Sequence, residues 1–155
     1  MNAAVAVRAG TADDRGFARD LGRRTAGSSV ASVRAPRYDD VLLALERLFD
    51  FVFAREHAFL IAEDGNERIG FLLMLFDIPD EVTLTQQAFI AYTAVEPAAR
   101  GRGVARALLD AAEAIARAHG LRYMSLMVTE ENEPARALYD GAGFVTERRM
   151  MTKPL

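Results

Sequence analysis

Hydrophobic residues recur along this chain with two different spacings, one typical of strands and the other of helices. Stretches in which apolar residues are continuous or alternate with polar ones, bounded by Gly, Pro, Asn or Asp, predict strands. The expected strands are Ala4–Arg8, Ala58–Ala62, Ile69–Phe76, Val82–Val95, Leu121–Val128 and Phe144–Thr152.

Other stretches carry apolar residues every three to four positions, which predicts helices. They run from Thr11 to about Leu21, from Asp39 or Asp40 to Val52, from Gly103 to His119, and from Asn132 to about Gly141. Between the first two helices, Gly22–Arg37 is rich in Gly, Ser and Arg and predicts a loop.

The order of these elements predicts a mixed α/β fold. The helix Gly103–His119 is expected to join two parallel strands by a right-handed crossover. With 155 residues the chain is long enough to bury one core, so we expect a single domain covering residues 1–155.

Composition narrows the classes of function. The formal net charge of −3 argues against a nucleic-acid-binding surface, and the absence of cysteine excludes disulfides and thiolate nucleophiles. The two histidines, His57 and His119, have no metal-ligand spacing, so no metal site is expected. No apolar run is long enough to span a membrane, and Met1–Arg8 is too short and too weakly apolar for a signal peptide. We therefore expect a cytoplasmic protein without a nucleic-acid or membrane partner.

The turn Arg100–Arg106 lies between an expected strand and an expected helix and carries the most specific pattern in the chain. The first N–H groups of a helix have no partner within the helix, and the helix dipole makes that end positive. Two glycines in the turn let a ligand come close to the backbone. We therefore predict a pocket for a phosphate or pyrophosphate, with added charge from Arg100, Arg102 or Arg106. The simpler alternative is a connection that happens to use glycine, in which Arg106 pairs with Asp110.

Two other phosphate-binding loops fit this turn less well. Gly101-x-Gly103 begins a dinucleotide-binding fingerprint, but Arg106 stands where that fingerprint needs Gly or Ala for close helix packing. A nucleoside-triphosphate loop needs a Gly-Lys-Ser/Thr sequence, which does not follow here.

Two motifs in the same half of the chain point to one protein family. Arg100-x-x-Gly103-x-Ala105 matches the Q/R-x-x-G-x-G/A signature of the GNAT superfamily of N-acetyltransferases, and the V-x-P sequence before it matches the family's strand ending. Downstream, Asn132–Phe144 resembles the family's N-x-x-A-x-x-L-Y-x-x-x-G-F segment. The chain therefore resembles this superfamily well over about Phe59–Thr152, and loosely over the first two helices.

The resemblance implies a GNAT-like fold, with a mixed, largely antiparallel central sheet of about six to seven strands and about four flanking helices. A central parallel strand pair would open for the cofactor. The implied activity is transfer of an acetyl group from acetyl-CoA, as co-substrate, to a primary amine of a small molecule or of a protein N-terminus or lysine. Direct attack in a ternary complex is expected, because no cysteine is present to carry the acetyl group. We expect a monomer or a homodimer.

The resemblance also implies which residues hold the cofactor. The end of the long strand would run beside the pantetheine arm, and one of its amides would polarise the acetyl carbonyl. The amides of the glycine turn would hold the pyrophosphate. Asn132 would contact the pantetheine or phosphate portion, or else serve only as a helix cap. The residues expected at the cofactor are Thr93, Ala94, Val95, Arg100, Gly101, Arg102, Gly103, Val104, Ala105, Arg106 and Asn132.

Tyr139 is the expected catalytic residue, since the resemblance implies that it protonates the leaving thiolate as general acid. Its alternative role is that of a core aromatic with a solvated hydroxyl. The chain departs from the family pattern at the general base. Many family members carry a Glu on the strand before the signature or on the next, whereas the comparable inward positions here hold Phe89, Tyr92 and Met127, none of which is a base.

Nearby carboxylates are candidates for the missing base, or are only solvated loop residues. They are Asp77, Glu81, Glu130 and Glu131. Proton transfer through water would need no dedicated base. Specificity for the acceptor is expected in the first two helices, in Gly22–Arg37 and in Asp77–Thr85. Two alternative functions stay open: a non-catalytic acyl-CoA-binding sensor or interaction module, and a nucleotide-binding regulator.

Overall fold

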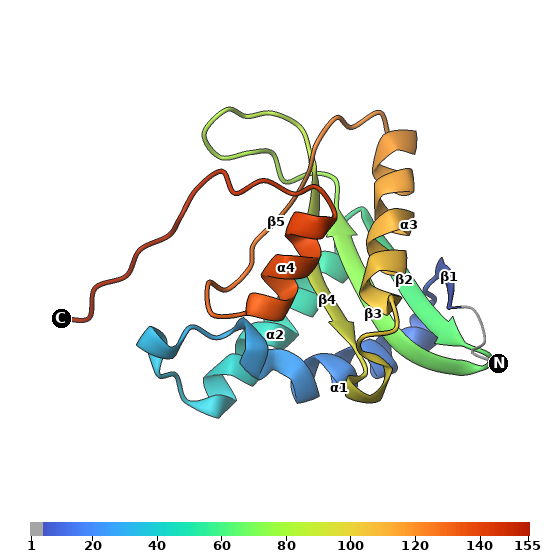
Figure 1. Ribbon diagram of the computed structural model, residues 1–155, viewed down its shortest axis with the longest axis horizontal. Coiled ribbons are helices and arrows are strands. Elements are labelled where there is room, and N and C mark those ends of the chain that lie inside the picture. The colour runs from blue at the N-terminus through green and yellow to red at the C-terminus, as the bar shows by residue number, and fades with distance from the viewer. Residues whose placement is uncertain (1–4) are drawn as a thin grey trace.

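A computed structural model describes residues 5–155 and places five strands in one sheet (Figure 1). The strands are β1 (Ala6–Ala9), β2 (His57–Asp64), β3 (Glu67–Leu75), β4 (Ala88–Val95) and β5 (Met124–Leu126). They lie side by side in chain order and are antiparallel, except for the parallel pair of β4 and β5. Ala4, the first residue of the expected strand Ala4–Arg8, lies outside the described residues.

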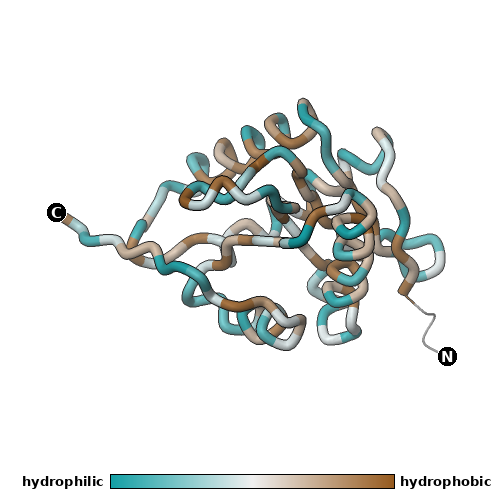
Figure 2. The backbone as a smooth tube through the Cα atoms, turned by 90° about the horizontal axis from the view of Figure 1, so that it is seen from above, coloured by the Kyte–Doolittle hydropathy of each residue, from teal (hydrophilic) through white to brown (hydrophobic). Residues whose placement is uncertain are grey.

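Helices cover both faces of this sheet. They are α1 (Arg15–Thr25), α2 (Tyr38–Phe53), α3 (Val104–Ala118) and α4 (Glu133–Gly141). Short 3₁₀ turns lie in the connections, namely η1 (Ala12–Asp14), η2 (Ala26–Ser29), η3 (Ser32–Arg34) and η4 (Pro97–Ala99). The helices α1 and α2 pack on one face and α3 and α4 on the other (Figure 1, Figure 2). None of the helices within residues 5–155 is long and apolar enough to cross a membrane.

The alternation of side chains along each strand divides the core between the two faces. On the face of α1 and α2, Phe71 and Leu73 of β3 pack in one cluster with Phe49 of α2. On the other face, Leu72 of β3 packs in a second cluster with Leu108 of α3. All five side chains are completely buried, so β3 is apolar on both faces. This double burial explains why its sequence is a nearly continuous apolar run.

A β-bulge in β4 marks the point where the sheet opens. Leu73 of β3 lies opposite Tyr92, and the next residue of β3 lies opposite Ile90, so Ala91 has no partner. The pairing of β4 with β5 also ends at Ile90, opposite Leu126. A bulge bends its strand and increases the local twist. Beyond Ile90, β4 therefore has β3 on one side and no paired strand on the other, as far as residues 5–155 show.

The mixed, largely antiparallel sheet, the four helices and the parallel pair that flanks α3 confirm the predicted architecture. The sheet has five strands rather than the six to seven expected, because Phe144–Thr152 forms no strand. Polar side chains of this segment bond to other loops, and its backbone does not pair with a strand. Arg148 pairs with Asp80, and Arg34 donates a hydrogen bond to the Thr152 hydroxyl at 3.2 Å.

Two other strands are shorter than predicted. β4 begins at Ala88 instead of Val82, because the Asp80 carboxylate accepts hydrogen bonds from the N–H groups of Val82 and Thr83 and holds that segment in a turn. β5 covers only the middle of the expected strand Leu121–Val128, since the chain leaves β4 after Leu126.

The loop predicted over Gly22–Arg37 is partly helical. Gly22 lies inside α1, which continues to Thr25, and a Cβ at this position would come within 3.2 Å of Leu45 and of Phe49. Close packing of α1 against α2 therefore favours a small residue at a position where sequence alone suggests a helix end. The capping prediction for α2 is also wrong, since Arg37 is its N-cap. Asp39 and Asp40 lie in its first turn instead.

Candidate active site

The glycine turn follows β4 directly, as the sequence pattern predicts. Gly101 and Gly103 have φ angles of 74° and 80°, in the left-handed region that favours glycine. Both residues are exposed, and a Cβ at either position would meet no other atom within 4 Å. The backbone of the turn is therefore open to a ligand from outside.

The start of α3 presents unpaired backbone donors. Gly103 is its N-cap, and the first hydrogen bond of the helix runs from the Ala107 N–H to the Gly103 carbonyl oxygen at 2.9 Å. The N–H groups of Val104, Ala105 and Arg106 therefore have no acceptor within the helix, and no side chain caps this end. Together with the positive end of the helix dipole, these donors suit an anion such as a phosphate group.

The three arginines of the turn differ in their surroundings. Arg102 pairs with Asp64 in the hairpin between β2 and β3. Arg106 donates to Asp110 at 2.9 Å, as the simpler alternative predicts, and also to the carbonyl oxygen of Gly141 at 3.0 Å. This second bond joins the first turn of α3 to the end of α4. Arg100 is exposed, and no ion pair holds it within the described part of the chain.

The open edge of β4 also offers backbone groups. The Glu96 N–H donates to the Ile69 carbonyl oxygen of β3 at 2.8 Å. Because successive residues of a strand direct their N–H groups to opposite sides, Thr93 and Val95 direct theirs away from β3. Ala94 directs its own N–H toward β3, and its side chain is buried on the face of α1 and α2. Of the three strand residues expected at the cofactor, only Thr93 and Val95 therefore present an unpaired N–H at this edge.

Tyr139 lies on α4, and Asn132 is the N-cap of that helix, about two helical turns before Tyr139. The Tyr139 ring packs edge-to-face on Phe144, with ring centres 5.6 Å apart. Burial raises the pKa of the Tyr139 hydroxyl above its usual value, so the hydroxyl keeps its proton at neutral pH. The Asn132 side chain accepts from the Ala135 N–H at 3.3 Å, as a helix cap does, and donates to the Ser28 carbonyl oxygen at 3.4 Å.

A hollow of about 270 Å³ lies beside Asn132, between η2 and the start of α4. It is lined by Gly27, Ser28, Val30, Glu131, Asn132 and Pro134. Further hydrogen bonds join η2 and η3 to the loop before α4. The Ser32 N–H and hydroxyl of η3 donate to Glu131 at 3.0 and 2.8 Å, and Thr129 donates to the Ser29 carbonyl oxygen of η2 at 2.9 Å. The lining residues of η2 fall within Gly22–Arg37, where sequence reasoning expects acceptor specificity, but that reasoning did not place them beside Asn132. Their Gly and Ser composition marks a connection but contains no signal that links it to a segment about a hundred positions away.

The candidate bases are mostly engaged elsewhere. Asp80, which is not one of the candidates, holds the loop before β4 in place, and hydrogen bonds from Thr83 and Arg148 keep the pKa of its carboxyl well below its usual range. The bond from Arg55 likewise lowers the pKa of Asp77. Glu131 accepts from Ser32, as described above. Proton removal by a dedicated carboxylate therefore has little support in this geometry.

Glu130 and Glu81 are the two remaining candidates. Glu130 lies 3.6 Å from Arg136, and its side chain is exposed. Glu81 is exposed in the loop before β4. Neither carboxylate is buried beside Tyr139 or the open edge of β4, so neither has the surroundings of a tuned general base.

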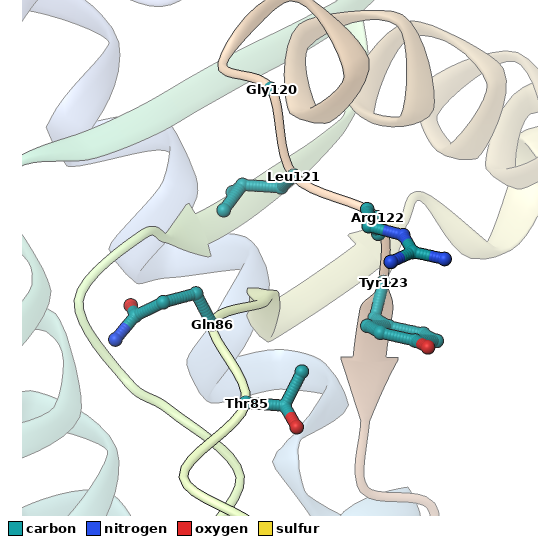
Figure 3. Close-up of a pocket in the computed structure, with 6 residues that line it drawn as sticks. All are labelled: Thr85, Gln86, Gly120, Leu121, Arg122 and Tyr123. Carbon is teal, nitrogen blue, oxygen red and sulfur yellow. The ribbon is translucent and has the colours of Figure 1, made fainter.

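A second hollow, of about 380 Å³, lies at the opposite end of β4 and β5 (Figure 3). It is lined by Thr85, Gln86, Gly120, Leu121, Arg122 and Tyr123. These residues precede β4 and β5, whereas the glycine turn follows β4. This hollow therefore contains none of the residues expected at the cofactor.

Comparison with known proteins identifies the family. A model of the acetyltransferase (GNAT) family matches residues 29–144, a segment that contains the glycine turn, the open edge of β4, Asn132 and Tyr139. This chain belongs to the acetyltransferase (GNAT) family. The family is one of acyltransferases, and its members use acetyl-CoA.

Individual relatives match over parts of the chain. The mycothiol acetyltransferase of Beutenbergia cavernae is 41% identical over 87 residues, which are 55% of this chain and 27% of that protein. The uncharacterized N-acetyltransferase YycN of Bacillus subtilis is 39% identical over 70 residues, 45% of each chain. The chain thus spans less than half the length of either relative.

Solved structures match over nearly the whole chain. A protein of Pyrococcus furiosus, provisionally named an acetyl transferase, superposes with a TM-score of 0.82 at 27% identity, covering 98% of this chain and 100% of its own. The aminoglycoside acetyltransferase AAC(6')-Iy, in complex with a bisubstrate analogue, superposes with a TM-score of 0.72 at 22% identity and covers 99% of both chains. At that identity the second likeness concerns the fold alone.

Proposed function

We propose that this protein, as one domain over residues 1–155, is an N-acetyltransferase that transfers an acetyl group from acetyl-CoA to a primary amine. The observation that carries the proposal is the open N-terminus of α3, directly behind two left-handed glycines and the uncovered edge of β4. Membership of a family of acyltransferases that use acetyl-CoA supports this proposal.

In this proposal the glycine turn holds the pyrophosphate. The N–H groups from Gly101 to Arg106 act as donors, and the helix dipole favours the negative charge. Arg100 adds an exposed guanidinium that suits bidentate contact with phosphate oxygens. Arg102 and Arg106 instead brace the turn through Asp64 and Asp110.

The pantetheine arm would run along the open edge of β4. Thr93 and Val95 supply the N–H groups, and one of them polarises the acetyl carbonyl oxygen. Asn132 reaches the arm from α4, for which its contact with the Ser28 carbonyl has to give way. The Arg106–Gly141 hydrogen bond keeps α3 and α4 together around this site.

Tyr139 would donate its proton to the sulfur of the leaving thiolate. Its raised pKa keeps the proton in place until negative charge develops on that sulfur. The amine loses its proton to water, because none of the candidate carboxylates has the surroundings of a tuned general base. The chain contributes chiefly by positioning the reactants and by stabilising the oxyanion.

Thiol release in the presence of a panel of primary amines tests this proposal. We expect turnover with at least one amine, and the Tyr139→Phe variant should reduce kcat by about a hundredfold or more. Its Tm should stay close to that of the parent, because the ring still packs on Phe144. Tyr123→Phe, at an exposed tyrosine outside the site, is the matched control and should leave kcat unchanged.

The same assay separates the alternative function. Binding of acetyl-CoA without turnover of any amine would favour a non-catalytic acyl-CoA sensor. The engagement of two candidate bases, Asp77 with Arg55 and Glu131 with Ser32, is the observation that favours this alternative. Turnover that is identical in the parent and in Tyr139→Phe would instead remove Tyr139 from the mechanism.

A further inference from the structure

Lysine is nearly absent from this chain. Of its 19 Lys and Arg residues, Lys153 is the single lysine, and all the others are arginines. The guanidinium group of arginine stays protonated in proteins and is not an amine acceptor. Lys153 therefore carries the one side-chain primary amine of a chain that we propose to acetylate primary amines.

The C-terminal segment presents this amine to solvent. From Phe144 onward the chain forms neither helix nor strand, and it extends away from the body of the molecule (Figure 1, Figure 2). Lys153 is exposed, and Pro154 follows it. Proline disfavours the helical backbone region for the residue before it, which favours an extended conformation at Lys153.

Contacts of the segment lead back to the candidate active site. Arg34, the last residue of η3, donates to the hydroxyl of Thr152, the residue just before Lys153. Ser32 at the start of η3 is bound to Glu131, which lines the hollow beside Asn132. The tail that carries the lysine is therefore attached to the same connection that borders the site from the side of α1 and α2.

We propose that Lys153 is a site at which the protein acetylates itself. This inference rests on the proposed function. The neutral ε-amino nitrogen forms a bond to the acetyl carbon of acetyl-CoA, and the carbon–sulfur bond breaks. The sulfur takes a proton from Tyr139, and the proton lost by the amine goes to water. The products are N-acetyl-lysine and the free thiol of coenzyme A, and no oxidant or reductant is needed.

Intact-protein mass spectrometry after incubation with acetyl-CoA, followed by peptide mapping, tests the assignment. The parent protein should gain one acetyl group that maps to Lys153. Lys153→Arg keeps the positive charge, should gain nothing in that peptide, and should acetylate small amines at the parent rate. Tyr139→Phe should slow the gain as much as it slows turnover. Direct chemical acetylation of Lys153 would proceed equally fast in this variant, so the comparison separates it from enzymatic transfer.

The dependence of the acetylation rate constant on protein concentration shows whether the acetyl group is transferred within one molecule or between two. A rate constant independent of concentration indicates transfer within one molecule, and one that rises with concentration indicates transfer between two copies. Both results support the assignment. It is overturned if the enzyme turns over a small amine while Lys153 stays unmodified, or if Lys153 is acetylated equally fast in Tyr139→Phe. If neither a small amine nor Lys153 is acetylated, the proposed function fails as well.

Discussion

Two glycines at opposite ends of α3 allow a matched test of the phosphate-binding turn. Gly103 precedes the helix with a φ of 80°, and Gly120 follows it with a φ of 73°. A Cβ at either position would meet nothing within 4 Å, so the two sites are alike in backbone strain and in available space. Only Gly103 lies where we propose that the pyrophosphate binds.

The expected effect on stability is the same for the two alanine variants. A left-handed conformation costs an L-residue about 1–2 kcal/mol. For a domain of this size each kcal/mol lowers Tm by about 2–4 °C. Gly103→Ala and Gly120→Ala should therefore melt several degrees below the parent protein and close to one another.

The expected effect on cofactor binding differs between them. The methyl group of Gly103→Ala stands in the open space in front of the turn and hinders the approach of a phosphate to the backbone donors. Losing one hydrogen bond to a charged group costs about 1.5–3 kcal/mol. The KM for acetyl-CoA should then rise by about tenfold to a hundredfold. Gly120→Ala should leave this KM unchanged.

Steady-state thiol release at varied acetyl-CoA concentration, together with thermal melting, measures both effects. Melting curves verify that the two variants are folded at the assay temperature. The reasoning is refuted if both variants raise the KM for acetyl-CoA equally, because backbone strain alone would then explain the change. It is equally refuted if Gly103→Ala loses stability but binds acetyl-CoA like the parent.

Further predictions concern the acceptor side and the response to pH. Glu131→Ala removes the acceptor for the Ser32 donors and loosens η3, so the KM for the amine should rise by about fivefold, worth about 1 kcal/mol, while the KM for acetyl-CoA stays constant. Glu133→Ala, which removes a neighbouring exposed carboxylate, is the control, and an equal effect would contradict a role for η3. Hydrogen bonds from Arg8 and Thr11 hold the pKa of Asp14 well below its usual range, so Asp14 stabilises the fold above its unfolded pKa of about 4. Urea unfolding should show that Asp14→Asn is less stable than the parent at neutral pH, and that this difference shrinks as the pH falls below about 4; a difference that is constant with pH would contradict the assignment.

Much of the local structure around the candidate site could be predicted because its signals are local. The left-handed glycines at 101 and 103, the cap at Asn132 and the left-handed Gly120 after α3 each depend on a few neighbouring residues. Such features follow from backbone sterics and from the first hydrogen bonds of a helix. The predicted order of strand, turn and helix around α3 is therefore confirmed.

The features that sequence reasoning missed depend on distant partners. Phe144–Thr152 has strand-like residues, but a strand exists only where a neighbour supplies the ladder, and Asp80 and Arg34 hold this segment instead. Gly22 resembles a helix end, yet close packing against Leu45 keeps it inside α1. The hydrogen bonds between η3 and the loop before α4 join residues about a hundred positions apart, for which a single sequence carries no signal.

The most direct test of the central claim is thermal melting of the protein with acetyl-CoA, coenzyme A, NAD and ATP in parallel. A ligand present at about 100 times its Kd stabilises the folded state by about 2.7 kcal/mol, which for this chain length raises Tm by about 5–10 °C. The account predicts a rise of this size with acetyl-CoA and with coenzyme A, and none with NAD or ATP. No rise with the two coenzyme A compounds, or a larger one with NAD or ATP, would contradict it.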